Sequence, residues 1–310
     1  MFFFNELLWG FPTRRVKFIC LYGAEGKTTA AKLIQYILGQ LQISSSLYSP
    51  KTNLSRFVQR QLRQNVKYII SESPLPVAKV ITAQINLDQD PREIAQKIEI
   101  TSTKLSFVYK GCRLITDSPY LYLINTISTA FDVCQQIGIS AQVFAETIKH
   151  FPEILGQREE INNHFQFRTF LDSAQTPLAI KAVLASFTEL PHHHLIVILG
   201  HSSFRDKSQR PAIGQILLQY ADKIYFTADD TVKESVFEIA KDVFGPTKDK
   251  KVILVPSRQD AFNQAVRNAN KNDLLIALGR GRRNYLIQNN TRFPWSEAEA
   301  FRTAFRIKNL

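Results

Sequence analysis

The stretch VKFICLYGAEGKTTAAKLIQYIL, residues 16–38, decides the fold. The apolar run over 16–22 predicts a buried strand, and helical spacing of apolar residues predicts a helix over 27–38. Glycine amides, a helix N-terminus, a lysine and a hydroxyl group between such elements form a cradle for phosphate groups. We therefore predict that the nucleotide phosphates are bound by Gly23, Gly26, Lys27, Thr28 and Thr29, with Thr28 also holding Mg²⁺.

The spacing of this loop differs from the common phosphate-binding loop. That loop has four residues between its glycines, whereas only Ala24 and Glu25 separate Gly23 from Gly26. The alternative interpretation is a glycine-rich turn that precedes a helix without binding a ligand. The order of strand, Gly-Lys-Thr and helix argues against that alternative.

Length and charge set limits on the class of protein. The chain has 310 residues, 45% of them hydrophobic, so we expect two domains, each with a hydrophobic core. A net charge of +12 favours anionic partners such as nucleotides, nucleic acid, phosphorylated metabolites or an anionic membrane surface. The basic residues are scattered along the sequence apart from GRGRR at 279–283, so an ordinary basic surface accounts for most of the charge.

The N-terminal segment MFFFNELLWGF is apolar but short, and Pro12 follows it. It is far below the ~20 residues that a membrane span needs, and no small-residue cleavage site follows it. We interpret it as a packing segment, with a membrane-surface contact as the alternative. The three cysteines lack ligand-like spacing, which suits a reducing cytoplasm, and we predict a cytoplasmic protein.

Short apolar runs alternate with helical patterns along the whole chain. In the first half we expect a helix over 91–100 and a hairpin around Lys110-Gly111. The second half repeats strand and helix, which predicts a parallel sheet covered by helices on both faces. The predicted fold class is α/β, with a P-loop-type domain over 1–155 followed by a Rossmann-like domain over 156–310.

Four further segments extend the first motif into an ordered series. They are LGQREE (155–160), LDSAQTPLAIKAVL (171–184), LGHSSFRDKSQRPAIGQILLQYADKIYFTADD (199–230) and LIALGRGRRNY (275–285). Together with Gly-x-x-Gly-Lys-Thr-Thr, they make the chain resemble the Mur ligase family over residues 16–300. The branch that it resembles most is that of the UDP-N-acetylmuramoyl-tripeptide synthetases, which add the third residue of the peptidoglycan stem.

The resemblance implies an ATP-dependent acid–amino acid ligase that works through an acyl phosphate. It assigns Lys27 to the β- and γ-phosphates and Glu72 to a second Mg²⁺, alone or with Asp88 or Asp90. It also matches Asn86 to a nucleotide-site asparagine of the family. The alternative for Glu72 is an ordinary solvated carboxylate at a strand end.

The second half carries the remaining implied contacts with ATP. Asp172 would hydrogen-bond the ribose, Arg158 would bind the nucleotide or its phosphates, and Arg205 would line the same cleft as a catalytic residue. For Asp172 and Arg205 the alternative is a surface ion pair of well under ~1 kcal/mol.

The chain also departs from the family in several places. It starts almost at the phosphate-loop strand, so we expect the UDP-sugar-binding domain to be missing, with a partner chain as one source of it. The segment QINLDQD (84–90) has no clear counterpart of the metal-binding histidine. The lysine that the family carbamylates has only a weak counterpart in Lys97.

The residues expected to contact the amino acid are the most unusual. Family branches that add a diamino acid carry Asp-Asn-Pro-Arg or Asp-Asn-Pro-Ala and a later glutamate. Here Asp229-Asp230-Thr231-Val232 replaces the first motif, and Arg283 replaces the glutamate. Since a guanidinium repels an amine and attracts a carboxylate, we predict that lysine and diaminopimelate are not added in the usual way. The alternative is that Arg282 and Arg283 belong to an exposed basic turn.

Three functions follow from this sequence. The first is an ATP- and Mg²⁺-dependent ligase acting on a small-molecule acid and an amino acid, in peptidoglycan synthesis or on a related acid. The second is a degenerate nucleotide-binding scaffold or regulatory protein without ligase activity. The third, favoured only by charge, is a nucleic-acid-stimulated ATPase, which would require a basic face. We expect neither a nucleic-acid partner nor a membrane span.

Overall fold

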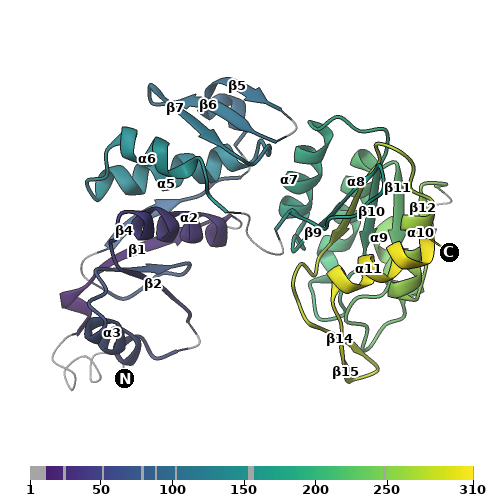
Figure 1. The fold of residues 1–310 in the computed structure, drawn as a ribbon. Coiled ribbons are helices and arrows are strands. Elements are labelled where there is room, and N and C mark those ends of the chain that lie inside the picture. Colours follow the sequence, from purple (N-terminus) through teal and green to yellow (C-terminus); the bar gives the residue numbers. More distant parts are fainter. Residues whose placement is uncertain are drawn as a thin grey trace. The chain divides into compact units, whose positions relative to one another are not determined.

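The computed structural model describes residues 12–23, 26–50, 52–77, 80–87, 89–101, 103–152, 157–246 and 249–309. The chain divides into two compact units, Met1–Pro152 and Glu153–Leu310, and Figure 1 shows the elements of each. The predicted boundary between residues 155 and 156 lies outside the described residues, as do Asp88 and the segment 1–11.

Unit 1 is built on a parallel sheet with the strand order β2-β3-β1-β4. Its central strand β1 is apolar and buried from Phe18 to Leu21, because it has a neighbour on either side. The strand and helix predicted over 16–38 are confirmed as β1 and α2. The sheet strands are β1 (Lys17–Tyr22), β2 (Ser45–Tyr48), β3 (Tyr68–Ser71) and β4 (Val80–Gln84).

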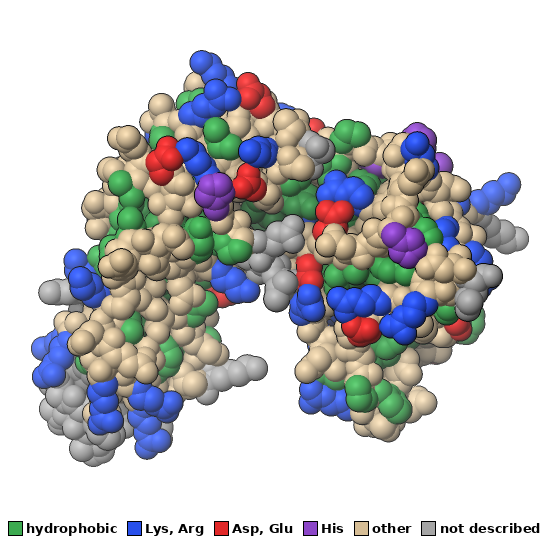
Figure 2. All heavy atoms as spheres, in the orientation of Figure 1, with side chains coloured by type: hydrophobic (Ala, Val, Ile, Leu, Met, Phe, Trp, Pro, Cys, Tyr) green, Lys and Arg blue, Asp and Glu red, His purple; other side chains and the backbone are tan. Residues whose placement is uncertain are grey.

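The helices of unit 1 differ in how much of their surface they bury. α2 buries seven residues, and α5 buries ten. α3 buries Leu54, Ser55 and Val58 and leaves its arginines exposed, and Figure 2 shows basic side chains gathered over it. The described helices are η1 (Pro12–Arg15), α2 (Lys27–Gln40), α3 (Leu54–Arg63), α4 (Pro91–Ile94), α5 (Leu123–Gln136) and α6 (Ala141–Ile148).

The helix predicted over 91–100 is wrong beyond its first turn. α4 ends at Ile94, and β5 (Gln96–Ile100) pairs antiparallel with β6 (Leu105–Tyr109) in a small sheet with β7 (Cys112–Thr116). Lys97 has a φ of 50°, a conformation that no right-handed helix contains, and cross-strand pairing overrides the local pattern. The predicted hairpin is confirmed, with positive φ at its two turn residues.

Unit 2 has a six-stranded sheet with the order β12-β11-β10-β13-β9-β8, in which only β8 is antiparallel. Its strands are β8 (Glu159–Glu160), β9 (Arg168–Asp172), β10 (Leu195–Leu199), β11 (Lys223–Phe226), β12 (Val252–Leu254) and β13 (Leu274–Leu278). The central strands β10 and β13 are apolar and buried throughout, as expected for a parallel sheet covered on both faces. The predicted Rossmann-like domain is therefore confirmed.

Helices pack together in two groups around this sheet, α7 with α8 and α9, and α10 with α11. α11, which the sequence analysis missed, buries Phe301 and Phe305 in the core beside α10 (Figure 1). The remaining elements are α7 (Pro177–Thr188), η2 (Lys207–Gln209), α8 (Arg210–Tyr220), α9 (Val236–Phe244), α10 (Arg258–Arg267), α11 (Glu297–Lys308) and the hairpin β14 (Tyr285–Gln288) and β15 (Thr291–Pro294). Among the described residues, no helix is both long and apolar enough to cross a membrane.

Candidate functional site

The loop after β1 has the backbone that a phosphate cradle needs. Gly23 has a φ of 132°, and a Cβ atom there would collide with the carbonyl oxygen of Ile85. Gly26 has a φ of 80° and is the N-cap of α2, and as a glycine it has no side chain that could cap the helix. The backbone therefore needs glycine at both positions, and the first turn of α2 lies where a phosphate group would bind.

Polar side chains meet at this helix N-terminus. Thr28 Oγ1 donates a hydrogen bond to Glu72 Oε2 at 2.7 Å, which joins the first turn of α2 to the residue after β3. Lys27 Nζ donates to the carbonyl oxygen of Gly23 and so folds back over the loop. A hydroxyl oxygen and a carboxylate oxygen this close together are hard donors of the kind that Mg²⁺ prefers, so the residues present fit that ion.

The sequence analysis missed a third part of this site, which comes from α5. Asn125 and Thr126 are buried, and Asn125 Oδ1 and Thr126 Oγ1 have no hydrogen-bond partner among the described residues. A Cβ atom at Gly26 would lie 3.5 Å from Thr126 Oγ1, so this polar surface borders the loop. Each buried polar atom without a partner costs about 1–3 kcal/mol, which a bound polar ligand would offset.

The other residues assigned to unit 1 occupy different positions. Asn86 follows β4, and its carbonyl oxygen accepts a 2.7 Å hydrogen bond from Asn125 Nδ2. Thr29 is buried in the first turn of α2. Lys97 is exposed on β5 at a register shift of the antiparallel sheet. The described residues contain no group of three or more His, Cys, Asp or Glu side chains that could hold a metal ion.

In unit 2, a buried hydrogen bond links the backbone amide of Arg158 to the Asp172 carboxylate. Asp172 is at the carboxyl end of β9, where its Oδ2 accepts from Arg158 N at 2.9 Å and its Oδ1 from Ala174 N at 2.6 Å. The Arg158 side chain is buried and donates from Nε to Ser186 Oγ at 3.2 Å. Both residues therefore stabilise the backbone at the end of β9. That they also contact the nucleotide stays a prediction.

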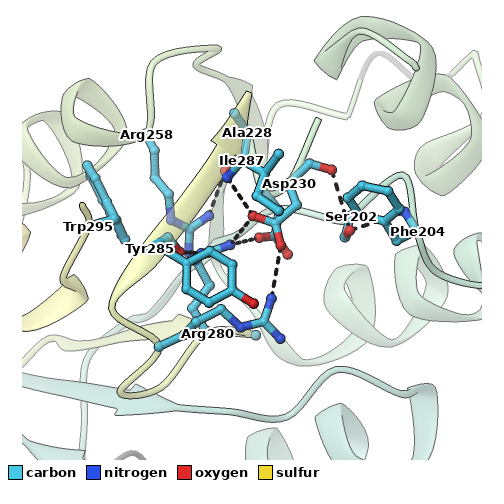
Figure 3. Close-up of polar contacts among 12 residues, drawn as sticks. Ser202, Phe204, Ala228, Asp230, Arg258, Arg280, Tyr285, Ile287 and Trp295 are labelled. Carbon is cyan, nitrogen blue, oxygen red and sulfur yellow. Dashed lines mark hydrogen bonds and ion pairs between the residues drawn. The ribbon is translucent and has the colours of Figure 1, made fainter. Parts of the chain in front are cut away.

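A network of charges occupies the carboxyl ends of β11 and β13. Arg280 Nη1 contacts Asp229 Oδ1 and lies 3.1 Å from Asp230 Oδ1, and Arg283 Nη1 donates to Asp230 Oδ2 at 3.0 Å. Arg205 Nη2 lies 3.9 Å from Asp229 Oδ2, beyond hydrogen-bond distance. Figure 3 shows Asp230 inside this network, where it also accepts from the amide of Ile287.

This charge network contains several buried polar atoms with no hydrogen-bond partner among the described residues. They are His201 Nε2, Arg205 Nη2, Thr227 Oγ1, Asp229 Oδ2 and Arg280 Nε. Burial lowers the pKa of His201 to about 4, with a further contribution from the charges of Arg210 and Arg205, so the imidazole is neutral at pH 7. The network therefore presents donors and acceptors side by side, as a site for a zwitterionic or carboxylate-bearing molecule would.

The two arginines at the end of β13 have separate partners. Arg282 forms a bidentate pair with Glu159, next to β9, and Arg283 pairs with Asp230. Their side chains retain 45% and 30% exposure, respectively. Both guanidinium groups are therefore held in place while part of each remains open to solvent.

Comparison with known proteins shows which family this chain is similar to. Residues 157–281 match the family described as Mur ligase, glutamate ligase domain. The predicted resemblance to the Mur ligases is thus confirmed over this part of the chain. It is 28% identical over 211 residues to UDP-N-acetylmuramoyl-L-alanyl-D-glutamate–2,6-diaminopimelate ligase 1 of Clostridium acetobutylicum, covering 66% of this chain and 44% of that protein. It is 26% identical over 210 residues to UDP-N-acetylmuramyl-tripeptide synthetase of Borreliella burgdorferi, covering 66% and 41%.

Solved structures share the fold of this chain. The MurF ligase from Thermotoga maritima in complex with ADP aligns with a TM-score of 0.64 at 11% identity, over 98% of this chain and 84% of that one. Folylpolyglutamate synthase of Mycobacterium tuberculosis aligns with a TM-score of 0.62 at 13% identity, over 98% and 94%. The chain spans less than half the length of the curated relatives that it matches.

Proposed function

We propose that this chain is an ATP-dependent ligase that joins an amino acid to a carboxylic acid, on a peptidoglycan precursor or a related acid. The observation that carries the proposal is the 2.7 Å hydrogen bond between Thr28 and Glu72 at the N-terminus of α2. It brings a hydroxyl and a carboxylate to the loop where the triphosphate of ATP would bind. Similarity to the Mur ligases supports the reaction class.

In this proposal each residue of the loop has a separate task. The amides at the start of α2 bind phosphate oxygens, and Lys27 moves from the Gly23 carbonyl to the β- and γ-phosphates. Thr28 and Glu72 would hold Mg²⁺, which neutralises phosphate charge when bound. Phosphoryl transfer to the acid then depends on positioning and charge neutralisation, and the amine attacks the resulting acyl phosphate.

The charge network of unit 2 would select the amino acid. Arg205 Nη2 and Asp229 Oδ2 lie 3.9 Å apart, and neither atom has a hydrogen-bond partner among the described residues, so they suit the carboxylate and the amine of an amino acid. Arg283 adds a guanidinium that is 30% exposed and disfavours a second amine. The proposed substrate is thus an amino acid with a neutral or acidic side chain, whereas lysine and diaminopimelate would be rejected.

A second candidate is a nucleotide-binding scaffold without ligase activity. The observation that favours it is that Arg280 and Arg283 already neutralise Asp229 and Asp230. In such a protein the network would be a structural element, and only the loop of unit 1 would bind a ligand.

One experiment distinguishes these functions. Phosphate release from Mg-ATP is measured with a panel of amino acids and acceptor acids, and Lys27→Ala serves as the control. Release that depends on both substrates and is lost in Lys27→Ala supports the ligase. ATP binding without turnover supports the scaffold. Rapid, saturable release with lysine or diaminopimelate would contradict the proposed role of Arg283.

A further inference from the structure

Unit 2 contains an ion pair that is completely buried. Arg258 begins α10 and Glu297 begins α11, and their side chains are 1% and 0% exposed. The guanidinium donates two hydrogen bonds to the carboxylate, at 2.9 and 2.7 Å, and Trp295 Nε1 donates a third. Two buried charges carry a large desolvation penalty, and apolar side chains of similar volume often stabilise a fold equally well. Stability alone therefore does not explain why this position holds an ion pair.

The arginine of this pair also contacts the charge network. Arg258 Nη1 donates to the carbonyl oxygen of Ala228 at 2.8 Å (Figure 3). Ala228 directly precedes Asp229 and Asp230, the two carboxylates of the network. Burial alone would lower the pKa of Arg258, but the Glu297 carboxylate raises it above its ordinary value, with contributions from both aspartates. The guanidinium is thus bonded to the backbone of the network and interacts with its charges.

The loop that follows β10 packs against the same backbone segment. A Cβ atom at Gly200 would lie 2.5 Å from the carbonyl oxygen of Thr227 and 2.8 Å from the amide nitrogen of Asp229. No side chain larger than a hydrogen atom fits there, so the two strand ends are in direct contact. The backbone that carries Asp229 therefore has two supports, the loop after β10 and the guanidinium of Arg258.

The position of this backbone matters because two opposite charges are held apart beside it. Arg205 Nη2 lies 3.9 Å from Asp229 Oδ2, and neither atom has a hydrogen-bond partner among the described residues. Their attraction favours direct contact, so the gap persists only if the surrounding residues hold both groups in place. Groups that bind a ligand depend on such a supporting layer of residues for their position.

We propose that Arg258 and Glu297 are positioning residues of the amino-acid site. The pair links the peptide between Ala228 and Asp229 to the first turns of α10 and α11, and so keeps Asp229 Oδ2 from closing onto Arg205 Nη2. Glu297 acts through Arg258, because its carboxylate fixes the orientation of the guanidinium. In this role neither residue contacts the ligand. The inference rests on the proposed function for the nature of that ligand.

Amide hydrogen exchange of the full chain, followed by NMR, tests the positioning without any measurement of activity. Two reporter amides depend on where Asp230 lies, since Ser203 N donates to its carbonyl oxygen at 3.0 Å and Ile287 N donates to its Oδ1 at 2.9 Å. Arg258→Met/Glu297→Leu replaces the ion pair by apolar side chains and so avoids leaving one charge buried alone. Both reporter amides should exchange about tenfold faster or more in this variant, because the segment beside them loses a hydrogen bond from a charged group.

Lys308→Met is the matched control, because Lys308 links the same two helices at their other ends. Its Nζ, in the last turn of α11, donates at 2.9 to 3.0 Å to three carbonyl oxygens near the end of α10, those of Val266, Arg267 and Ala269. The first and last residues of α10 are roughly 14 Å apart along the helix. Lys308→Met should therefore lose stability but leave the exchange of both reporter amides close to that of the parent.

Steady-state kinetics tests the consequence for the ligand. In the proposed ligase reaction, Arg258→Met/Glu297→Leu should raise the KM for the amino acid about tenfold or more, because small displacements of binding groups weaken their contacts strongly. The KM for ATP should stay near that of the parent, since the phosphate loop belongs to unit 1. Lys308→Met should change neither constant.

The outcomes separate a positioning role from a purely structural one. Unchanged exchange of the reporter amides in the double variant would overturn the proposal, and so would equal acceleration in Lys308→Met, which would show a general loosening of unit 2. Faster exchange with an unchanged KM for the amino acid would also overturn it. If the parent released no phosphate in response to any amino acid, the proposed function would fail, whereas the exchange of the reporter amides would still decide whether the pair positions the network.

Discussion

Replacing Thr28 with valine tests the phosphate cradle most directly, since valine keeps the shape of threonine and removes only its hydroxyl group. Thr28 Oγ1 donates to the Glu72 carboxylate at 2.7 Å, and both residues are half-buried. A hydrogen bond to a charged group contributes about 1.5–3 kcal/mol, and partial exposure favours the lower end. The free protein should therefore lose about 1.5 kcal/mol of stability, a decrease of about 3–6 °C in the melting temperature.

The effect on nucleotide binding should be larger than the effect on folding. The same hydroxyl would be an oxygen ligand of Mg²⁺, so we expect Mg-ATP to bind about 10–100-fold more weakly, a loss of about 1.4–2.8 kcal/mol. Calorimetric titration with ATP, with and without Mg²⁺, measures this loss, and the effect should be smaller without Mg²⁺.

Thr52→Val is the matched control within unit 1. Thr52 is exposed and its hydroxyl donates to the Ser49 carbonyl oxygen at 2.9 Å, so it also loses one hydrogen bond. It should keep the nucleotide affinity of the parent. The reasoning would be refuted if Thr28→Val bound Mg-ATP as tightly as the parent, or if the two variants lost affinity equally.

Three further predictions concern the backbone of the loop and the interior of unit 2. Gly23→Ala should reduce Mg-ATP affinity at least about tenfold in a titration, because its φ of 132° and the Ile85 carbonyl oxygen leave no room for a methyl group. Arg258→Met should lower the free energy of unfolding by about 3–5 kcal/mol in urea, since it leaves the buried Glu297 carboxylate unpaired; Arg258→Met/Glu297→Leu should recover much of that loss. His201 has a folded-state pKa of about 4 against an ordinary 6.5, so the unfolded chain takes up the proton first and stability should fall as pH drops from 6.5 to 4. His201→Gln should flatten that part of the profile of stability against pH, and an unchanged slope would contradict the assignment.

Much of the fold could be predicted because its strands are continuous apolar runs and its helices repeat every three to four residues. β1, β10 and β13 are buried on both faces, so their sequences are apolar at every position or nearly so. The prediction was wrong for residues 96–100, which form β5 instead of a helix. Ile98, Glu99 and Ile100 alternate as in a strand, but this run is short, and its strand conformation depends on pairing with β6. The sequence analysis missed α11, because charged residues are interspersed with its apolar residues and make the apolar pattern less evident.

Only those residues of the candidate site that belong to a short local motif could be predicted from the sequence. Gly23, Gly26 and Thr28 lie within six residues, so their chemistry can be read without tertiary information. Asn125 and Thr126 left only an indirect signal, polar residues within an otherwise buried helix, and their position beside the loop depends on how α5 packs.

The sequence by itself determined the strand, loop and helix of the phosphate cradle, because these depend on neighbouring residues and on the backbone freedom of glycine. It also determined the alternation that makes a parallel sheet. Only the tertiary structure decided that Arg283 pairs with Asp230, 53 residues away, and that Arg56, Arg60 and Arg63 are exposed on α3. Charges act through space, so their partners follow from the packing of α3, η1 and the strand ends rather than from their order along the chain.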